Sequence, residues 1–473
     1  MDASRRNFFH WATSGLAAAA GMSLGMKEGW LKGEGKGQAG APHHEPKAKR
    51  AIHIYLCGGL SQVDSFDYKP ELEKHHGKPL PSSEKPDVFF GKVGLLRQHD
   101  WKFQQRGKSG LWVSDLFPHL AQQADELTVI RSMVADTSNH TPATFQAHSG
   151  FRLNGFPVLG SWLSYGLGAE SEELPTFVVL PDPRGVPAGG SINWNSGFLP
   201  ARHQGVALKT RGPALDNLFP AQPQPAAAEA ATRKLLAELN RTHLEARPGR
   251  DDLLARIQAH DLAAKMQLAV PEATDLDKEP EYLQKLYGLD QPDTADFGRS
   301  CLLARRLLER GVRFVQLFSG GAFGQPRINW DGHEDMVKNH GREAARIDQP
   351  TAALLQDLKQ RGMLDDTLVI FTSEFGRTPF TQSGANELGK GRDHSQYGFS
   401  GWLAGGGLKH GTAYGSTDEF GLRAVENPVL WPDFHATILH LLGINHERLT
   451  FYHNGILRRL TNVSGNVIRD ILS

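Results

Sequence analysis

The chain has 473 residues, enough for one large domain with insertions or for two domains. Its 52 Lys and Arg residues balance its 52 Asp and Glu residues, so the formal net charge is zero. A broad nucleic-acid partner favours a basic surface, and this balance argues against one. The chain has only two cysteines, Cys57 and Cys301, both in apolar runs, so we expect two buried free thiols rather than a disulfide.

The N-terminus has the pattern of a twin-arginine export signal. Arg5 and Arg6 precede a short, weakly apolar stretch from Trp11 to Met26 that is rich in Ala and Gly. This stretch is too short for a lasting membrane span, and the polar stretch that follows is typical of a spacer. We therefore expect residues 1–49 to be a signal and spacer read by the twin-arginine export machinery, and the mature protein to be periplasmic or secreted. The alternative is a chance arginine pair before a polar tail.

Apolar runs and helical patterns alternate along the rest of the chain. We expect strands at Ala51–Leu56, Leu127–Val134, Phe177–Leu180, Arg313–Phe318, Leu368–Thr372 and Trp402–Ala404. We expect helices at Ser114–Ala124 (capped by Ser114), about Ser300–Arg310, near Thr351–Gln360 and at Pro432–Leu442. Strands that alternate with helices predict an α/β layered fold around a mainly parallel sheet.

Two regions break this alternation. The segment from His75 to Gly110 is polar with scattered aromatic residues, which favours a surface excursion. The segment of about 183–292 begins with a Gly/Pro-rich loop and becomes helical and charged from Ala226 to Tyr287. We interpret it as a helical lobe inserted into one domain that covers residues 50–473.

Carboxylates and imidazoles follow several of the predicted strands. Gly58 and Gly59 allow a tight turn after the first strand, so that Asp64 can point back across the strand's carboxyl end. Asp331 and His333 form an Asp-x-His pair, which in extended backbone places both side chains on the same side. Each observation also has a plainer interpretation, in which these residues form turns, caps or surface pairs.

Two further motifs complete the pattern. Glu374 closes the segment that starts with the apolar run 368–371, where a lone buried carboxylate is costly unless it is coordinated or paired. Arg377 is either its partner or a planar fork for a substrate anion, and Arg392 and His394 lie in a polar loop before the next strand. Since a parallel sheet gathers its strand ends on one edge, we predict a divalent metal centre there. Zinc, manganese, iron, calcium and magnesium all accept such ligands, and the residue types do not choose among them.

The combined motifs resemble the DUF1501 family. They are Gly58-Gly59-x-Ser-x-x-Asp64-x-Phe-Asp67-x-Lys-Pro, Trp330-Asp331-x-His333, Glu374-Phe-Gly-Arg-Thr-Pro, Gly391-Arg-Asp-His394, Thr417-Asp418-Glu419 and Phe434-His435-Ala436-Thr437. The resemblance covers residues 50–445 or so, and the family is similar to the sulfatase and alkaline-phosphatase superfamily. It implies a three-layer α/β/α sandwich. It also implies that Asp64 and Glu374 serve one metal position, while Asp331, His333 and His394 serve the other.

One stretch departs from the superfamily. Residues 139–150 resemble the sulfatase signature that starts with Cys-x-Pro-Ser-Arg, but His140 falls where the modified Cys or Ser nucleophile belongs. Ala143 and Thr144 replace the following Ser and Arg, so the resemblance implies that the formylglycine mechanism is unavailable. His140 is then a metal ligand or the acceptor of the transferred group, and Thr141 is a second candidate nucleophile. The alternative is a capping loop in a protein that has lost catalysis.

These observations support two functional hypotheses. The first is an exported metal-dependent hydrolase of phosphate or sulfate esters, including esters on glycans, in which Arg377 and Arg392 offset the charge of the substrate anion. The second is a non-catalytic surface protein that binds anionic glycans on a sulfatase-like scaffold. A phosphoryl-transferring mutase fits the same superfamily, with no distinct support in the sequence.

Overall fold

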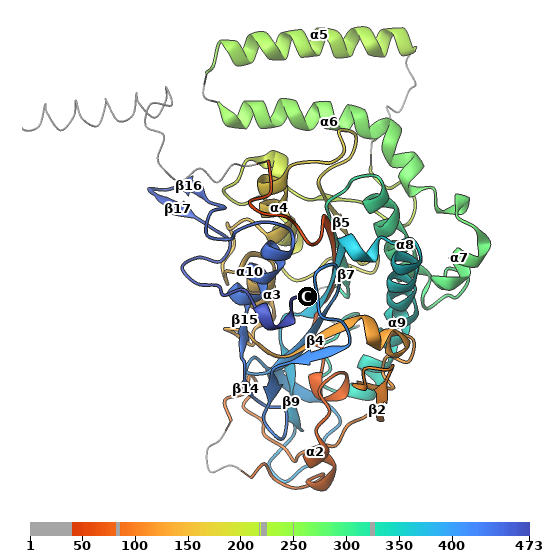
Figure 1. Cartoon of the computed structure of the whole chain (residues 1–473), viewed down its shortest axis with the longest axis vertical. Helices are drawn as coiled ribbons and strands as arrows, with labels where there is room; N and C mark the ends of the chain where they lie inside the picture. Colours follow the sequence, from red (N-terminus) through yellow and green to blue (C-terminus); the bar gives the residue numbers. More distant parts are fainter. Residues whose placement is uncertain (1–39, 82–85, 217, 219–224, 249, 322–326) are drawn as a thin grey trace, which may run out of the picture.

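A nine-stranded sheet forms the centre of the computed structural model, which describes residues 40–81, 86–216, 218, 225–248, 250–321 and 327–473 (Figure 1). The strand order is β12 (Thr412–Tyr414), β4 (Leu127–Val134), β11 (Phe399–Gly405), β8 (Thr367–Ser373), β1 (Arg50–Leu56), β7 (Phe314–Ser319), β5 (Phe177–Leu180) and β6 (Val206–Ala207), and β15 (Val429–Leu430) also pairs with β4. Only β11 runs antiparallel to its neighbours in this sheet. The predicted mainly parallel sheet is therefore confirmed.

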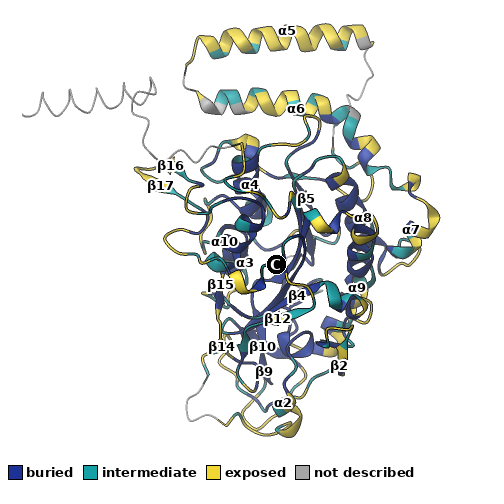
Figure 2. Ribbon diagram, in the orientation of Figure 1, coloured by how far each residue is buried: buried dark blue, intermediate teal, exposed yellow. Residues whose placement is uncertain are grey.

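Helices cover both faces of the sheet, which makes the three predicted layers. One face packs against α8 (Ala295–Glu309) and α9 (Met336–Gln360), and the other against α3 (His140–Ser149), α4 (Leu159–Leu167) and α10 (Trp431–Leu441). Strand β1 shows the division, because Ile52 and Ile54 belong to the first apolar core while Ala51 and Tyr55 belong to the second. The central strands β11, β8, β1, β7 and β5 are buried along nearly all their length, as Figure 2 shows, which explains their mainly apolar sequences.

The charged segment predicted as helical forms α5 (Ala226–Glu245), α6 (Asp251–Thr274) and α7 (Glu281–Leu286). Helix α6 contacts α8, whereas α5 lies beside α6 at one end of the molecule, with its length exposed in Figure 2. Together with α2 (Pro70–Lys74), these helices complete the α-helices among the described residues.

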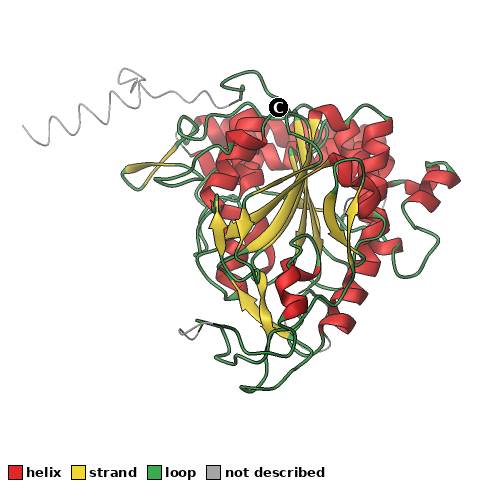
Figure 3. Cartoon of the chain, turned by 60° about the horizontal axis from the view of Figure 1, so that its bottom comes forward, coloured by secondary structure: helices red, strands yellow, loops and turns green. Residues whose placement is uncertain are grey.

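Within the part of the chain that the structure describes, four short two-stranded antiparallel ribbons lie outside the central sheet (Figure 3). They are β2 (Phe103–Arg106) with β3 (Leu111–Ser114), β9 (Gly376–Thr381) with β10 (Arg392–Ser395), β13 (Ser416–Thr417) with β14 (Ala424–Glu426), and β16 (Phe451–His453) with β17 (Ile456–Arg458). The β9–β10 ribbon matters most here, because it continues directly from β8 and carries two of the predicted site motifs.

One predicted helix is wrong. Ser114 does not cap a helix but ends β3, where its hydroxyl donates to the Asp64 carbonyl oxygen at 2.6 Å. A 3-10 helix at Leu120–Glu126 replaces the predicted α-helix, since Pro118 interrupts the segment. Both cysteines are buried and free, as predicted. Among the described helices, none combines the length and hydrophobicity needed to cross a bilayer, and the predicted export signal in residues 1–39 lies outside the described residues.

Candidate metal centre

Four side chains from three parts of the chain converge at the carboxyl edge of the sheet. His140 begins α3 after β4, Asp331 and His333 lie in the loop after β7, and His394 lies on β10. One ligand atom from each lies within 4.8 Å of the others. The parallel strands β1, β7 and β8 explain this meeting, because their carboxyl ends share one edge.

Two glycines permit the close approach of these loops. Gly58 has φ +120°, and a Cβ there would lie 2.6 Å from the Asp331 amide nitrogen. At Gly391 a Cβ would lie 1.7 Å from the carbonyl oxygen of His333. A side chain at either position would push the Asp331–His333 loop away from its place, so both glycines are needed for the geometry.

Each imidazole of the group has its Nδ1 atom occupied by an acceptor. His394 Nδ1 lies 2.6 Å from the Ser138 carbonyl oxygen, which can only accept. His140 Nδ1 lies 2.8 Å from Glu374 Oε1, an oxygen that already accepts from Gly58 N at 2.8 Å. His333 Nδ1 contacts the side-chain oxygen of Gln382. These partners assign the proton to Nδ1 and leave Nε2 as the coordinating atom, the arrangement usual for metal-bound histidine.

The three Nε2 atoms surround a single carboxylate oxygen. Asp331 Oδ1 lies 2.7 Å from His333 Nε2 and 3.2 Å from the Nε2 atoms of His140 and His394. With neutral rings, lone pairs face an anionic oxygen, while with charged rings three imidazolium groups crowd together beside Arg377. A cation among these atoms relieves both conflicts. The donor set of three imidazoles and one carboxylate therefore fits a bound metal ion.

Burial and neighbouring charges shift the pKa values within the group. Burial opposes ionisation of Asp331, but the nearby charge of Arg377, followed by the contacts with the three imidazoles, outweighs burial and holds the pKa of Asp331 below its usual range. Burial keeps the pKa of His394 well below its ordinary value. For His140 burial acts in the same direction, yet hydrogen bonds to Asp331 and Glu374 raise its pKa overall. Asp331 is thus an anionic ligand at neutral pH.

Arg377 contacts the metal-type ligand Asp331, and its carboxylate partner differs from the one that the sequence suggests. Its Nη2 donates to Asp331 Oδ1 at 2.8 Å and its Nε to the Gly59 carbonyl oxygen at 3.0 Å. The carboxylate paired with Arg377 is therefore Asp331 rather than Glu374. Glu374 instead accepts from Gly58 N, His140 and, at 3.3 Å, the Tyr55 hydroxyl.

Asp64 and Arg392 form a separate buried ion pair. Arg392 Nε lies 2.9 Å from Asp64 Oδ2, and Asp64 also accepts from the Ser61 hydroxyl at 2.6 Å. Asp64 and Glu374 thus bind different partners, and these contacts do not support the shared metal position implied by the family resemblance. The side chains of Arg377 and Arg392 have no exposed surface. Because a buried charge needs partners, both guanidinium groups are directed to acceptors within the protein. Their predicted role as anion binders stays a prediction.

The sequence matches the model of the family described as "Protein of unknown function (DUF1501)" over residues 48–472. The chain belongs to the DUF1501 family. A search of curated proteins finds no match.

Among solved structures, this DUF1501 member is similar to sulfatases and an alkaline phosphatase. The PsFucS1 sulfatase from Pseudoalteromonas sp. shares 15% identity, with 86% of this chain and 70% of that chain covered and a TM-score of 0.35. The alkaline phosphatase from the Antarctic bacterium TAB5 shares 12% identity over 85% and 99% of the two chains, with a TM-score of 0.35. Ps i-CgsB in complex with k-i-k-neocarrahexaose shares 12% identity over 84% and 72%, with a TM-score of 0.36. Likeness at this level carries no argument about activity.

Two residues that contact the ligands of this DUF1501 centre, Arg327 and Gln382, are not predicted from the sequence. Arg327 pairs with the second oxygen of Asp331 and, at 2.8 Å, with Glu334, and 23% of its side chain is exposed. Its place four residues before Asp331 is the only signal available. The sequence gives no signal for Gln382, because its contact with His333 depends on the turn that follows β9. Thr141, the second predicted nucleophile, is half-buried in the first turn of α3.

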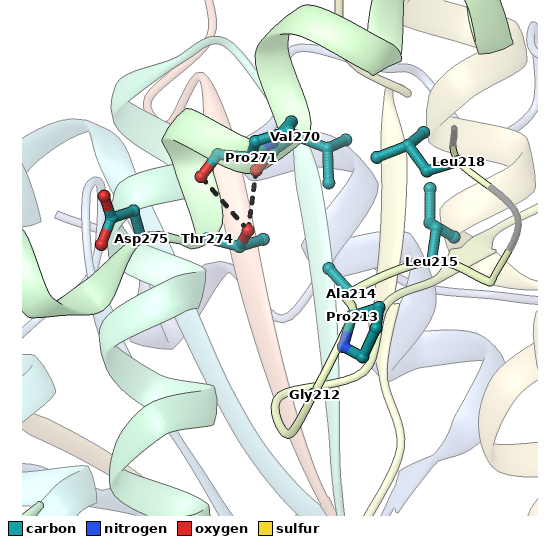
Figure 4. Close-up of a pocket in the computed structure, with 9 residues that line it drawn as sticks. All are labelled: Gly212, Pro213, Ala214, Leu215, Leu218, Val270, Pro271, Thr274 and Asp275. Carbon is teal, nitrogen blue, oxygen red and sulfur yellow. Dashed lines mark hydrogen bonds between the residues drawn. The ribbon is translucent and has the colours of Figure 1, made fainter. Parts of the chain in front are cut away.

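A cavity of about 480 Å³ lies elsewhere, between the loop around Gly212 and α6 (Figure 4). Leu215, Leu218 and Val270 give it apolar walls, and the Thr274 hydroxyl donates to the Val270 carbonyl oxygen at 2.8 Å. None of its lining residues belongs to the metal centre. The cavity lacks a cluster of convergent polar side chains among its lining residues, so we do not take it as a candidate active site.

Proposed function

We propose that this protein is an exported metal-dependent hydrolase of phosphate or sulfate esters, with sulfated or phosphorylated glycans among its substrates. One observation carries the proposal: three imidazoles whose Nδ1 atoms are occupied direct Nε2 toward Asp331 Oδ1. A site built in this way at the carboxyl edge of a parallel sheet has the place and the donors of a catalytic metal centre.

The donor set favours a first-row transition metal. Three nitrogen ligands and one carboxylate suit zinc or manganese, whereas calcium and magnesium prefer sites built from oxygen. His140, Asp331, His333 and His394 would hold the ion. When bound, the ion supplies Lewis acidity that draws charge from an ester oxygen.

The protein's own groups supply the other requirements. Arg327 carries a partly exposed positive charge beside Asp331 and can offset the charge of a substrate anion. Both nitrogens of His140 already lie against Glu374 and Asp331, which argues against His140 as the acceptor of the transferred group. Thr141, the next residue of α3, remains the candidate side-chain nucleophile, with water as the alternative.

Export by the twin-arginine pathway belongs to the same proposal. It rests on Arg5 and Arg6 and the weakly apolar stretch behind them. Such export carries folded chains, which suits a protein that acquires its metal before it crosses the membrane.

The test combines metal analysis with turnover. Purified protein should hold close to one equivalent of a transition metal, and a panel of aryl phosphates and aryl sulfates should be hydrolysed in a reaction that a chelator stops. His394→Ala should lose metal and turnover together, and the exposed His410→Ala should lose neither. Metal content unchanged in His394→Ala would contradict the proposed site.

A second function, metal-dependent binding of anionic glycans without catalysis, has one observation in its favour. The group already offers four protein ligands, as a closed structural site does, whereas catalytic zinc sites usually offer three and leave one position open. Glycan binding with no turnover under any added metal would favour this function.

A further inference from the structure

Two exposed phenyl rings lie against the imidazoles of the metal centre. Phe89 and Phe90 are 45% and 52% exposed. The Phe89 ring centroid lies 4.9 Å from that of His394, and the Phe90 centroid lies 4.9 Å from that of His333 in an edge-to-face arrangement. The two phenyl rings also meet edge to face at 4.9 Å. A continuous aromatic surface, about half of it open to solvent, therefore borders two of the four metal-type ligands.

A buried carboxylate ties this surface to the centre. Asp393 accepts from Phe90 N at 2.9 Å through Oδ2 and from His394 N at 2.8 Å through Oδ1. Its side chain is fully buried, so the contact fixes the spacing between the phenyl rings and the ligand histidine. Upstream, Asp87 accepts from the Tyr397 hydroxyl at 2.9 Å and anchors the start of the turn.

The exposure of the two rings has no structural explanation within the turn itself. Val88, the residue before them, packs against the small apolar cluster that contains Leu72, Leu96 and Phe380. The rings stay outside that cluster, although each Å² of exposed apolar surface costs about 25 cal/mol relative to burial. Ligand sites commonly combine such aromatic walls with a few convergent polar groups.

We propose that Phe89 and Phe90 form an aromatic platform that binds the organic part of the ester, and that this part is a ring with an apolar face. The inference rests on the proposed function, because the metal centre must hold the anionic end of the same molecule. An aryl ring and the C–H face of a pyranose share the required chemistry, whereas a short or charged alcohol portion lacks it.

The test uses ligands that cannot be hydrolysed and compares binding with and without a ring. Metal-loaded protein is titrated calorimetrically with methylphosphonate, phenylphosphonate and a pyranosyl phosphonate, and with the matching sulfonates. We expect Phe89→Ala/Phe90→Ala to weaken binding of a ring-bearing ligand by about tenfold, with the methyl ligand and the metal content unchanged. The ring ligand that shows the loss, phenyl or pyranosyl, identifies the source of the ring.

Controls separate the platform from the centre. Tyr452→Ala removes an exposed ring from β16, 60% open to solvent, and should change no affinity. Equal weakening of all ligands in the double variant, or no weakening of any, would overturn the platform while leaving the metal centre intact. Metal-loaded wild-type protein that binds neither phosphonates nor sulfonates would contradict the proposed function, and the platform with it.

Discussion

His140 donates its Nδ1 hydrogen to Glu374 across 2.8 Å, which joins the start of α3 to the end of β8. Glu374 therefore orients a metal-type ligand without being one of the four convergent residues. We expect Glu374→Gln to lower metal affinity by roughly 10- to 100-fold, the usual effect of losing such a support, with the fold retained. Competition with a chelator of known affinity measures this. The exposed Glu447→Gln should match wild type, and equal affinities for all three proteins would contradict the role of Glu374.

Replacing two ligands separately should show that they serve one ion. His333→Ala and His394→Ala should each remove most of the bound metal, and the double variant should lose no more than either single variant, because both imidazoles approach the same oxygen of Asp331. Elemental analysis after gel filtration measures the metal. Half-occupancy in each single variant and none in the double would instead indicate two independent sites.

Stability should fall with acid partly through His53. Burial, followed by the nearby His435, lowers the folded-state pKa of His53 to about 3 from an ordinary value of 6.5. Between these values the unfolded chain binds more protons, so the free energy of unfolding falls as pH drops below about 6.5, by up to about 1.4 kcal/mol per pH unit for one such group. His53→Gln should make this fall shallower.

Urea unfolding between about pH 4 and pH 6, with a chelator present so that metal release does not contribute, measures the change. The exposed His410→Gln serves as the matched control and should keep the wild-type slope. If His53→Gln and wild type share one slope, protonation of His53 does not contribute to acid sensitivity.

Gly391 should tolerate no side chain. A Cβ there would overlap the His333 carbonyl oxygen, so Gly391→Ala must displace the loop that carries His333 and Asp331. We expect weaker metal binding and a loss of stability of about 2 kcal/mol or more, as overpacking usually causes. Gly341→Ala, inside α9 and with its nearest neighbour at 3.6 Å, should be neutral or stabilising. Similar melting temperatures and metal contents for the two variants would show that the loop carrying His333 moves to accept a side chain at position 391 at little cost, and would contradict this prediction.

The export proposal has its own test in the paired arginines. Lys at positions 5 and 6 keeps the charge, but receptor-read twin-arginine signals depend on the arginines themselves, so the double variant Arg5→Lys/Arg6→Lys should stay in the cytoplasm. Cell fractionation and immunoblotting follow the chain. Equal export of the double variant and wild type would argue for another route.

The sheet is readable from the sequence because its strands are buried on both faces. The run 177–180 is a continuous apolar stretch and the run 127–134 is mainly apolar, and they match β5 and β4 residue for residue. Ser114 shows where local pattern fails: it has the residue type of a helix cap, yet a distant carbonyl of Asp64 takes its hydroxyl.

The centre was predictable only to the level of residue type and strand end. Asp331 and His333 follow β7, and His394 lies on the β9–β10 ribbon that continues from β8, so their meeting follows from the edge that the carboxyl ends of β7 and β8 share. The sequence does not choose between a ligand and a nucleophile for His140, because its Nδ1 partner Glu374 lies 234 residues away. The buried pairing of Asp64 with Arg392 spans 328 residues and leaves no local signal in the sequence.

We propose that one metal ion lies among His140, Asp331, His333 and His394. Anomalous diffraction from crystals of the purified protein, recorded on both sides of the absorption edge of the metal found by elemental analysis, tests it most directly. We expect one strong peak about 2.0–2.2 Å from the three Nε2 atoms and from a carboxylate oxygen of Asp331. Full-length protein crystallised with its metal, but with no peak at these four side chains, would contradict it.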